Sequence, residues 1–241
     1  YDLTTMDMIS PSIAALTPSL TLKVTNRAKA MKAAGEEVYG LAGGEPEMDT
    51  PDNIKQAAIT ALNNGATKYT PSAGLPALRQ AIADKLKREN NLEYDPSQIT
   101  VGAGAKHACF NAIMATVSEG DEVIIPAPYW VSYPEMVRMC GGVPVIVETT
   151  PENGWKLTAE QFEEAMTPRT KMVILTTPNN PTGAVYFEEE LRALGEVAVS
   201  EDILILADEI YEHLVYGDVK HVSIASLSPE PVSYTHLTLP T

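Results

Sequence analysis

Short apolar runs alternate with longer stretches of helical spacing, and this alternation constrains the fold of the 241-residue chain more than any other feature. Several of the runs are apolar on successive residues, which is typical of strands covered on both faces. Strands that alternate with helices predict an α/β domain with a mostly parallel sheet sandwiched by helices. The predicted strands are residues 99–101, 122–125, 143–147, 171–175 and 203–207.

Helical patterns fill the segments around these runs. The predicted helix over residues 51–64 is expected to have Thr50 as its N-cap and Pro51 at its first position, and to end at Gly65. Residues 1–48 are expected to form an arm and the start of a small domain, and residues 49–230 a large domain. The predicted helices are residues 25–34, 51–64, 75–89, 105–117, 132–140, 158–166 and 188–200.

The composition excludes several classes of function. A formal net charge of -15 argues against binding to nucleic acid or to anionic membrane surfaces, because both require clustered Lys and Arg. No apolar run reaches membrane-spanning length and the given residues do not open on a basic segment followed by an apolar stretch, so we expect a cytosolic protein. Cys109 and Cys140 are expected to be buried thiols, and the four histidines show no metal-ligand spacing.

Residues that follow the predicted strands are candidates for a ligand site, because open α/β sheets bind ligands beyond the carboxyl ends of their strands. Gly104, Ala105 and Lys106 follow the first strand and lead into a helix, where backbone N–H groups can bind an anion. An ordinary strand-to-helix turn explains this segment equally well. A dinucleotide site is a weak alternative, because His107 stands where the glycine fingerprint needs Gly or Ala.

Polar and aromatic side chains follow three further strands. Trp130 could lie on a cofactor ring or simply pack, and Asn180 could donate its amide or serve a turn. Asp208 could pair with a ring nitrogen and Tyr211 with a ring hydroxyl, although an Asp in this place often caps a helix. Taken together, these strand ends match an aromatic ring with a basic nitrogen, a hydroxyl and one phosphate, which are the groups of pyridoxal phosphate.

Six segments in this order resemble the class I aminotransferases of pyridoxal-phosphate fold type I, most closely the bacterial aspartate aminotransferases. The resemblance runs from about Ile9 to Glu230. It implies the large domain of that fold in an incomplete form, with an N-terminal arm and part of a small domain. The segments are residues 42–46, 68–71, 104–108, 126–135, 179–183 and 207–211.

The resemblance implies a role for each candidate residue at the cofactor ring. Asp208 would pair with the pyridine nitrogen and keep it protonated. Tyr211 and Asn180 would hold the ring oxygen, and Trp130 would stack on the ring. Tyr69 would reach the phosphate bound in a neighbouring subunit, which implies a homodimer.

The resemblance also implies contacts to phosphate and substrate. Backbone N–H groups at Gly104, Ala105 and Lys106 would bind the phosphate. The substrates would be an amino acid, aspartate, and a 2-oxo acid, 2-oxoglutarate. Relatives that also accept prephenate have a lysine where this chain has Thr17, which favours aspartate. The residues implied in substrate contact are Gly44, Lys106, Trp130 and Asn180.

The sequence departs from the family pattern near its end. In the family, the lysine that forms the Schiff base follows the Asp208 strand, but no lysine follows Lys220, which lies in a polar, turn-like stretch. We therefore expect a fragment without a catalytic residue of its own, inactive in isolation. Residues 231–241 do not resemble the family and are expected to be foreign. A non-catalytic binding module with the same fold remains the alternative.

Overall fold

The computed structural model describes residues 9–18, 20–40, 48–227 and 235–237. Contacts divide the chain into two compact units, which are Tyr1–Leu16 with Ala73–Thr241, and Thr17–Ser72. We describe each unit by itself. The domain boundaries expected after residues 48 and 230 stay predictions.

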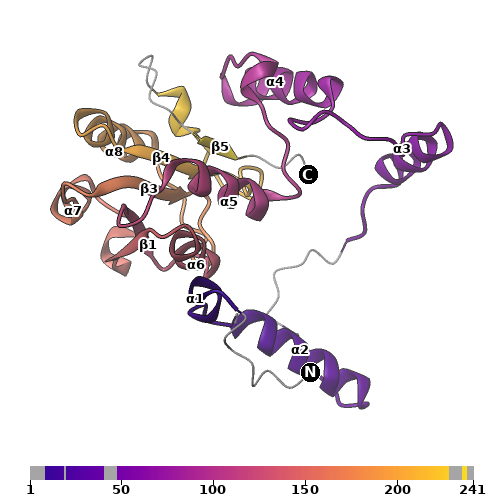
Figure 1. The fold of residues 1–241 in the computed structure, drawn as a ribbon, viewed down its shortest axis with the longest axis horizontal. Coiled ribbons are helices and arrows are strands. Elements are labelled where there is room, and N and C mark those ends of the chain that lie inside the picture. Colours follow the sequence, from indigo (N-terminus) through magenta and orange to yellow (C-terminus); the bar gives the residue numbers. More distant parts are fainter. Residues whose placement is uncertain (1–8, 19, 41–47, 228–234, 238–241) are drawn as a thin grey trace. The chain divides into compact units, whose positions relative to one another are not determined.

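The larger unit contains a parallel five-stranded sheet in the order β2-β1-β3-β4-β5 (Figure 1). Four of its strands match predicted apolar runs to within a few residues, so the parallel α/β fold is confirmed. The last residues of β3 and β4, Thr176 and Asp208, lie opposite each other. The strands are β1 Glu122–Ala127, β2 Val143–Glu148, β3 Thr170–Thr176, β4 Leu204–Asp208 and β5 Thr235–Leu237.

Two strand predictions differ from the structure. Residues 99–101 form no strand, because the N–H of Val101 donates to the carbonyl of Ala73 (2.9 Å) and none of the described ladders includes this segment. Conversely, β5 lies in the tail that the sequence excluded from the fold. Its backbone pairs in parallel with β4, with His236 opposite Ala207. A short apolar run does not form a strand unless a neighbouring backbone completes its ladder.

Helices cover both faces of the sheet, as the sequence predicts. Val123 and Ile125 of β1 pack with α5 Ala105–Thr116 and α6 Ser132–Met139, whereas Ile124 between them packs with α7 Ala159–Ala165 and α8 Glu188–Ser200. This alternation follows from the two-residue period of a strand. Burial on both faces explains why the strand sequences are apolar on successive residues.

The remaining elements are helices and single turns. The larger unit also holds α1 Pro11–Ala14, α4 Pro76–Asn90 and the turns η2 Pro96–Gln98, η3 Pro151–Asn153 and η4 Ile224–Ser226. The smaller unit holds α2 Leu20–Ala33 and α3 Asp52–Asn63.

The start of α3 differs from the prediction, and its end agrees with it. The N-cap is Pro51 and not Thr50, because the backbone at Pro51 is still extended (ψ 140°) and turns into the helix only at Asp52. Asp52 then places an acidic group at the positive helix end. Gly65 follows the last turn with φ +83°, a left-handed conformation that glycine adopts without strain.

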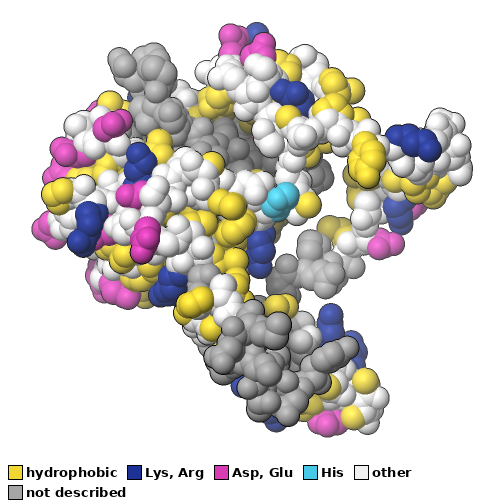
Figure 2. All heavy atoms as spheres, in the orientation of Figure 1, with side chains coloured by type: hydrophobic (Ala, Val, Ile, Leu, Met, Phe, Trp, Pro, Cys, Tyr) yellow, Lys and Arg dark blue, Asp and Glu magenta, His cyan; other side chains and the backbone are white. Residues whose placement is uncertain are grey.

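Charged side chains of both signs are interspersed over the sheet-containing unit on the face that Figure 2 shows. Cys109 is buried and Cys140 half-buried, and both are free thiols. Among the described residues, no three His, Cys, Asp or Glu side chains are grouped so that they could hold a metal ion. No helix in the described ranges is both long and apolar enough to cross a bilayer.

Candidate functional site

Asp208, the last residue of β4, is the centre of the candidate site. Its side chain is only 3% exposed. Tyr133 donates its hydroxyl to Oδ2 (2.7 Å), and the N–H of Ile210 donates to Oδ1 (3.2 Å). Burial raises the pKa of Asp208, while these two hydrogen bonds act to lower it. Its hydrogen-bond donors among the described residues, which are Tyr133, Cys109 and the N–H of Ile210, are all neutral, so the carboxylate is suited to a cationic ligand.

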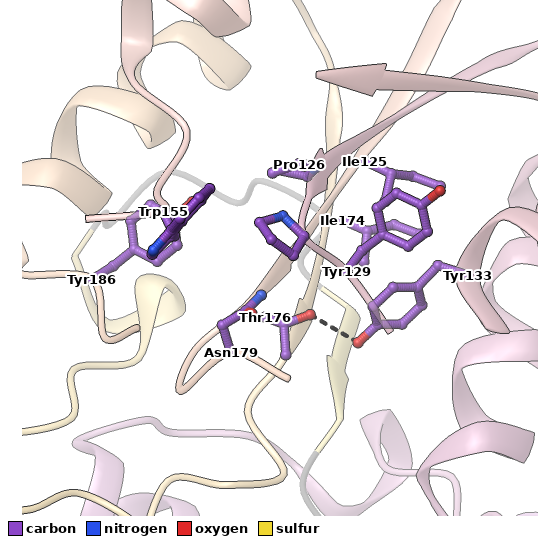
Figure 3. Close-up of a pocket in the computed structure, with 10 residues that line it drawn as sticks. Ile125, Pro126, Tyr129, Tyr133, Trp155, Ile174, Thr176, Asn179 and Tyr186 are labelled. Carbon is purple, nitrogen blue, oxygen red and sulfur yellow. Dashed lines mark hydrogen bonds between the residues drawn. The ribbon is translucent and has the colours of Figure 1, made fainter. Parts of the chain in front are cut away.

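Two side chains, Tyr133 and Cys109, contact this carboxylate from the helices on one face of the sheet. Tyr133 of α6 is 2% exposed and also shares a hydrogen bond with Thr176 Oγ1 (2.8 Å), drawn as the dashed line in Figure 3. Cys109 of α5 places its Sγ 3.8 Å from Asp208 Oδ2. Burial, followed by the charge of Asp208, raises the pKa of both the Tyr133 phenol and the Cys109 thiol. Both groups therefore remain protonated donors at neutral pH.

Sequence reasoning missed the roles of Tyr133 and Cys109. Both lie inside helices, and helical spacing alone does not tell which strand end a side chain will reach. Trp130 lies in the turn before α6, and the N–H of Tyr133 donates to its carbonyl (3.1 Å), so the closeness of the two residues in sequence is the only available signal. Here the two rings meet edge to face, with centroids 5.3 Å apart and an interplanar angle of 88°.

A small pocket lies at the same edge of the sheet, beside the Tyr133–Thr176 hydrogen bond (Figure 3). Tyr129 and Tyr133 line one side, and Trp155 and Tyr186 line the other. Asn179 lies close to Thr176 between them. This edge of the sheet thus combines aromatic side chains with the polar groups of Thr176 and Asn179.

The first turn of α5 forms a candidate anion site. Gly104 has φ +88° and no atom lies within 4 Å of the place where a Cβ would stand, so a ligand can approach the backbone closely. The N–H groups of Ala105 and Lys106 belong to the first turn, where an α-helix has no internal acceptors for them. His107, which breaks the dinucleotide fingerprint, accepts from the N–H of Ala103 through Nδ1 (3.0 Å).

The structure brings several of the other predicted residues to the same strand ends. Lys106 Nζ lies 4.9 Å from the centroid of the half-buried Trp130 ring, close enough for a cation–π contact. Asn180 Nδ2 and the hydroxyl of Tyr211 are 3.5 Å apart, at the limit of a hydrogen bond. The carboxylate, the aromatic ring, the amide–phenol pair and the anion site together suit a planar aromatic cation with a phosphate.

Two predicted residues are not placed with this group. Tyr69 belongs to the smaller unit and is fully exposed. Gly44 lies outside the described residues. Lys220 is exposed in the segment after β4, as expected for a surface turn. The functional roles of these residues, like those of the other site residues, remain predictions.

Comparison with known proteins identifies the family. The sequence model of "Aminotransferase class I and II" matches residues 36–239. The aspartate aminotransferase of Geobacillus stearothermophilus is 55% identical over 92% of this chain and 56% of its own length. A probable aspartate/prephenate aminotransferase of Aquifex aeolicus is 52% identical over 94% of this chain and 58% of its own length.

Solved structures agree with the sequence comparison. The aspartate aminotransferase of Thermus thermophilus with maleate superimposes with a TM-score of 0.89 at 48% identity, covering 92% of this chain and 58% of that one. The chain thus spans a little under three fifths of the relatives that it matches. Enzymes of this family use pyridoxal phosphate, whose ring nitrogen, ring oxygen and phosphate match the groups described above. The chain belongs to the class I and II aminotransferases, with the pyridoxal-phosphate-dependent transferase fold.

Proposed function

We propose that this chain forms the cofactor-binding part of a pyridoxal-phosphate-dependent aminotransferase that acts on aspartate and 2-oxoglutarate. The buried carboxyl of Asp208 is the observation that carries the proposal. It accepts hydrogen bonds from Tyr133 and Ile210 and has its pKa raised by burial, so a cation at this place would relieve the cost of burying its charge. The protonated ring nitrogen of pyridoxal phosphate is such a cation.

Each remaining group of the site has a task in this proposal. Asn180 and Tyr211 would hold the ring oxygen, and Trp130 would cover one face of the ring. The N–H groups of Ala105 and Lys106, beside Gly104, would bind the phosphate. When bound, the cofactor supplies an electron sink for the electrons released at the substrate α-carbon. The contribution of Asp208 is to keep the ring nitrogen protonated, which makes that sink effective.

The proposed substrate rests on the relatives and on one residue of the site. Relatives named aspartate aminotransferase reach 55% identity, and a matched structure contains maleate, a four-carbon dicarboxylate. Lys106 is exposed above Trp130 and offers a positive charge to a second carboxylate. Gly44, Asn180 and Trp130 would complete the substrate contacts.

A second candidate acceptor, prephenate, is favoured by relatives with "aspartate/prephenate" in their names at 51% and 52% identity. Such relatives resemble a pattern with lysine at the place of Thr17, so Thr17 argues against prephenate as a substrate. Kinetics of the complete protein with aspartate and either 2-oxoglutarate or prephenate distinguish the two. A kcat/KM for prephenate equal to that for 2-oxoglutarate would overturn our preference.

The catalytic lysine and the partner subunit complete the proposal. Lys220 is the one lysine after Asp208 in the 241 residues, and it is exposed rather than buried in a pocket. We therefore expect these residues by themselves to bind cofactor without turnover. The complete protein would be a cytosolic homodimer in which Tyr69 serves the neighbouring site.

Cofactor binding and turnover provide the test. The chain is titrated with pyridoxamine 5′-phosphate, which needs no lysine for binding, and separately incubated with pyridoxal phosphate, aspartate and 2-oxoglutarate. We expect saturable binding and no oxaloacetate. Turnover by this chain, or a stoichiometric borohydride-reducible cofactor adduct on Lys220, would contradict our expectation for Lys220. Binding without turnover by the complete protein would favour a non-catalytic module.

A further inference from the structure

Residues 208–212, at the end of β4 and in the turn that follows, place two side chains at the candidate site and two away from it. Asp208 contacts Tyr133 and Tyr211 lies beside Asn180, so both belong to the candidate site. Glu209 and Glu212 are also three residues apart, and the N–H of Glu212 donates to the carbonyl of Glu209 (3.0 Å). These two acids make their contacts elsewhere in the unit, although their backbone is continuous with that of the site residues.

Glu212 is bound at both carboxylate oxygens by the C-terminal half of α4. Its side chain is 6% exposed. Lys85 Nζ forms an ion pair with Oε1, and Asn90 Nδ2 donates to Oε2 (2.7 Å). Lys85 also donates to Asn90 Oδ1 (2.8 Å), which closes a triangle of three side chains. The contact joins residues more than a hundred positions apart in the sequence.

The contacts of Lys85 and Asn90 hold Glu212, the residue that follows Tyr211 in the chain. A buried carboxylate that loses its partners is strongly destabilised, so the turn is held where Lys85 and Asn90 can reach it. Within the described ranges, by contrast, the phenol of Tyr211 has one hydrogen bond, which is the long one from Asn180 (3.5 Å). One long hydrogen bond leaves the position of the phenol dependent on the backbone that carries it, and Glu212 is the next residue.

Glu209 supports the same turn from a second direction. Its side chain is fully buried, and Oε2 lies 3.3 Å from Nε2 of His221, which is itself largely buried. Asp208 and Tyr211 thus belong to a turn in which the side chains of Glu212 and Glu209 contact α4 and the later residue His221. Of the two acids, Glu212 is directly bonded to Tyr211 along the chain and has both oxygens engaged.

We infer that Glu212, held by Lys85 and Asn90, is a positioning residue that fixes the phenol of Tyr211 at the candidate site. The consequence for cofactor binding rests on the proposed function, whereas the effect on the position of Tyr211 does not. The experiment therefore measures both separately.

The position of Tyr211 is followed by ¹⁹F NMR on the whole chain labelled with 3-fluorotyrosine, and Tyr211→Phe identifies the resonance. We expect one narrow Tyr211 resonance in the wild type and a shifted or broadened one in Glu212→Ala. Glu212→Gln should restore most of the wild-type signal, because its amide oxygen can still accept from Asn90. Lys85→Met, which leaves the Asn90 contact in place, replaces Glu212→Ala if that variant fails to fold.

Glu122→Gln is the matched control. Glu122 is also a buried carboxylate, paired with Arg169, but it lies at the amino end of β1. It should leave the Tyr211 resonance unchanged. A wild-type Tyr211 signal in a folded Glu212→Ala or Lys85→Met chain would overturn the inference.

Affinity for pyridoxamine 5′-phosphate gives the functional readout. We expect Glu212→Ala to weaken binding about tenfold, as is typical of partners that orient a ligand-binding side chain, and Glu212→Gln to recover most of it. A Tyr211 resonance that responds to Glu212→Ala in a chain that binds no cofactor would refute the proposed function and support the positioning role. Unchanged affinity in a chain whose Tyr211 signal has moved would refute the role of this position in binding.

Discussion

Two carboxyl groups at opposite ends of the sheet are both almost inaccessible to solvent, yet their pKa values shift in opposite directions. Glu122 begins β1 and is 4% exposed, and Asp208 ends β4 and is 3% exposed. Glu122 accepts from Thr167 Oγ1 (2.6 Å) and from Arg169 Nε (3.0 Å), and these bonds lower its pKa. Burial raises the pKa of Asp208 instead.

Glu122 and Asp208 differ in the partners that surround their carboxylates. At the amino end of the sheet, Arg169 supplies a positive charge from within the chain, so Glu122 contributes to stability. At the carboxyl end, Asp208 receives neutral hydrogen-bond donors and no cation from the described residues. A charge left for an external partner is typical of functional sites, which are often not optimised for stability.

The largest expected effect is on cofactor binding when Asp208 is made neutral. Asp208→Asn removes the charge-assisted bond to the ring nitrogen, so the affinity for pyridoxamine 5′-phosphate should fall by roughly 10- to 100-fold. Its amide oxygen can still accept from Tyr133, whereas its NH₂ cannot accept from the N–H of Ile210. Removal of the buried charge offsets this loss, so we expect stability at pH 7 to change by less than about 1 kcal/mol. Fluorescence titration and thermal unfolding measure the two quantities. A large loss of stability with unchanged affinity would contradict this prediction, because it would show that Asp208 serves stability and not cofactor binding.

Glu122→Gln is expected to have the complementary effect. The variant loses the ion pair with Arg169 and weakens the bond from Thr167, so the free energy of unfolding should fall by about 1–3 kcal/mol. Affinity for pyridoxamine 5′-phosphate should stay within about twofold, because the residue lies at the end of the sheet away from the site. Urea unfolding and the same titration check this. A tenfold loss of affinity would show that the two ends are coupled.

Acidification should change the two stability differences, each taken as wild type minus variant, in opposite directions. The pKa of Glu122 is lowered in the folded chain, so its contribution to the free energy of unfolding is complete above the pKa of the unfolded chain. This contribution is lost as the pH falls through the pKa of the folded chain, and the wild type then loses its higher stability over Glu122→Gln. The raised pKa of Asp208 means that its charge costs stability above the folded value. As the pH falls toward its usual pKa, wild type recovers relative to Asp208→Asn. Free energies of unfolding of the wild type and the two variants, measured between pH 7 and pH 3, test the sign of both stability differences.

Cys109→Ala should have the smallest effect. Its thiol is a weak donor at 3.8 Å from Asp208, so cofactor affinity should change by less than about threefold. Removing Sγ from a fully buried site should cost about 1 kcal/mol of stability. Titration and urea unfolding measure both changes. A tenfold loss of affinity would mean that Cys109, and not Tyr133 alone, orients the carboxylate.

The sequence predicts most of the sheet because its strands are covered on both faces and their apolar runs are easily recognised. It also places Asp208, Trp130 and Asn180 at strand ends, where ligands bind. It fails at residues 99–101 and at β5, because strand formation depends on a neighbouring backbone and not on apolar content alone. The contacts of Tyr133 depend on how its helix packs on the sheet, which local spacing does not determine.

The protonation state of the bound cofactor ring tests the central claim most directly. Pyridoxamine 5′-phosphate labelled with ¹⁵N in its ring is bound to the chain, and the nitrogen shift is followed by NMR as the pH is raised. We predict that the ring nitrogen stays protonated well above the pH at which the free compound loses its proton, and that Asp208→Asn removes this difference while Glu122→Gln does not. A bound ring that titrates like the free compound in the wild-type chain would contradict the role we give to Asp208.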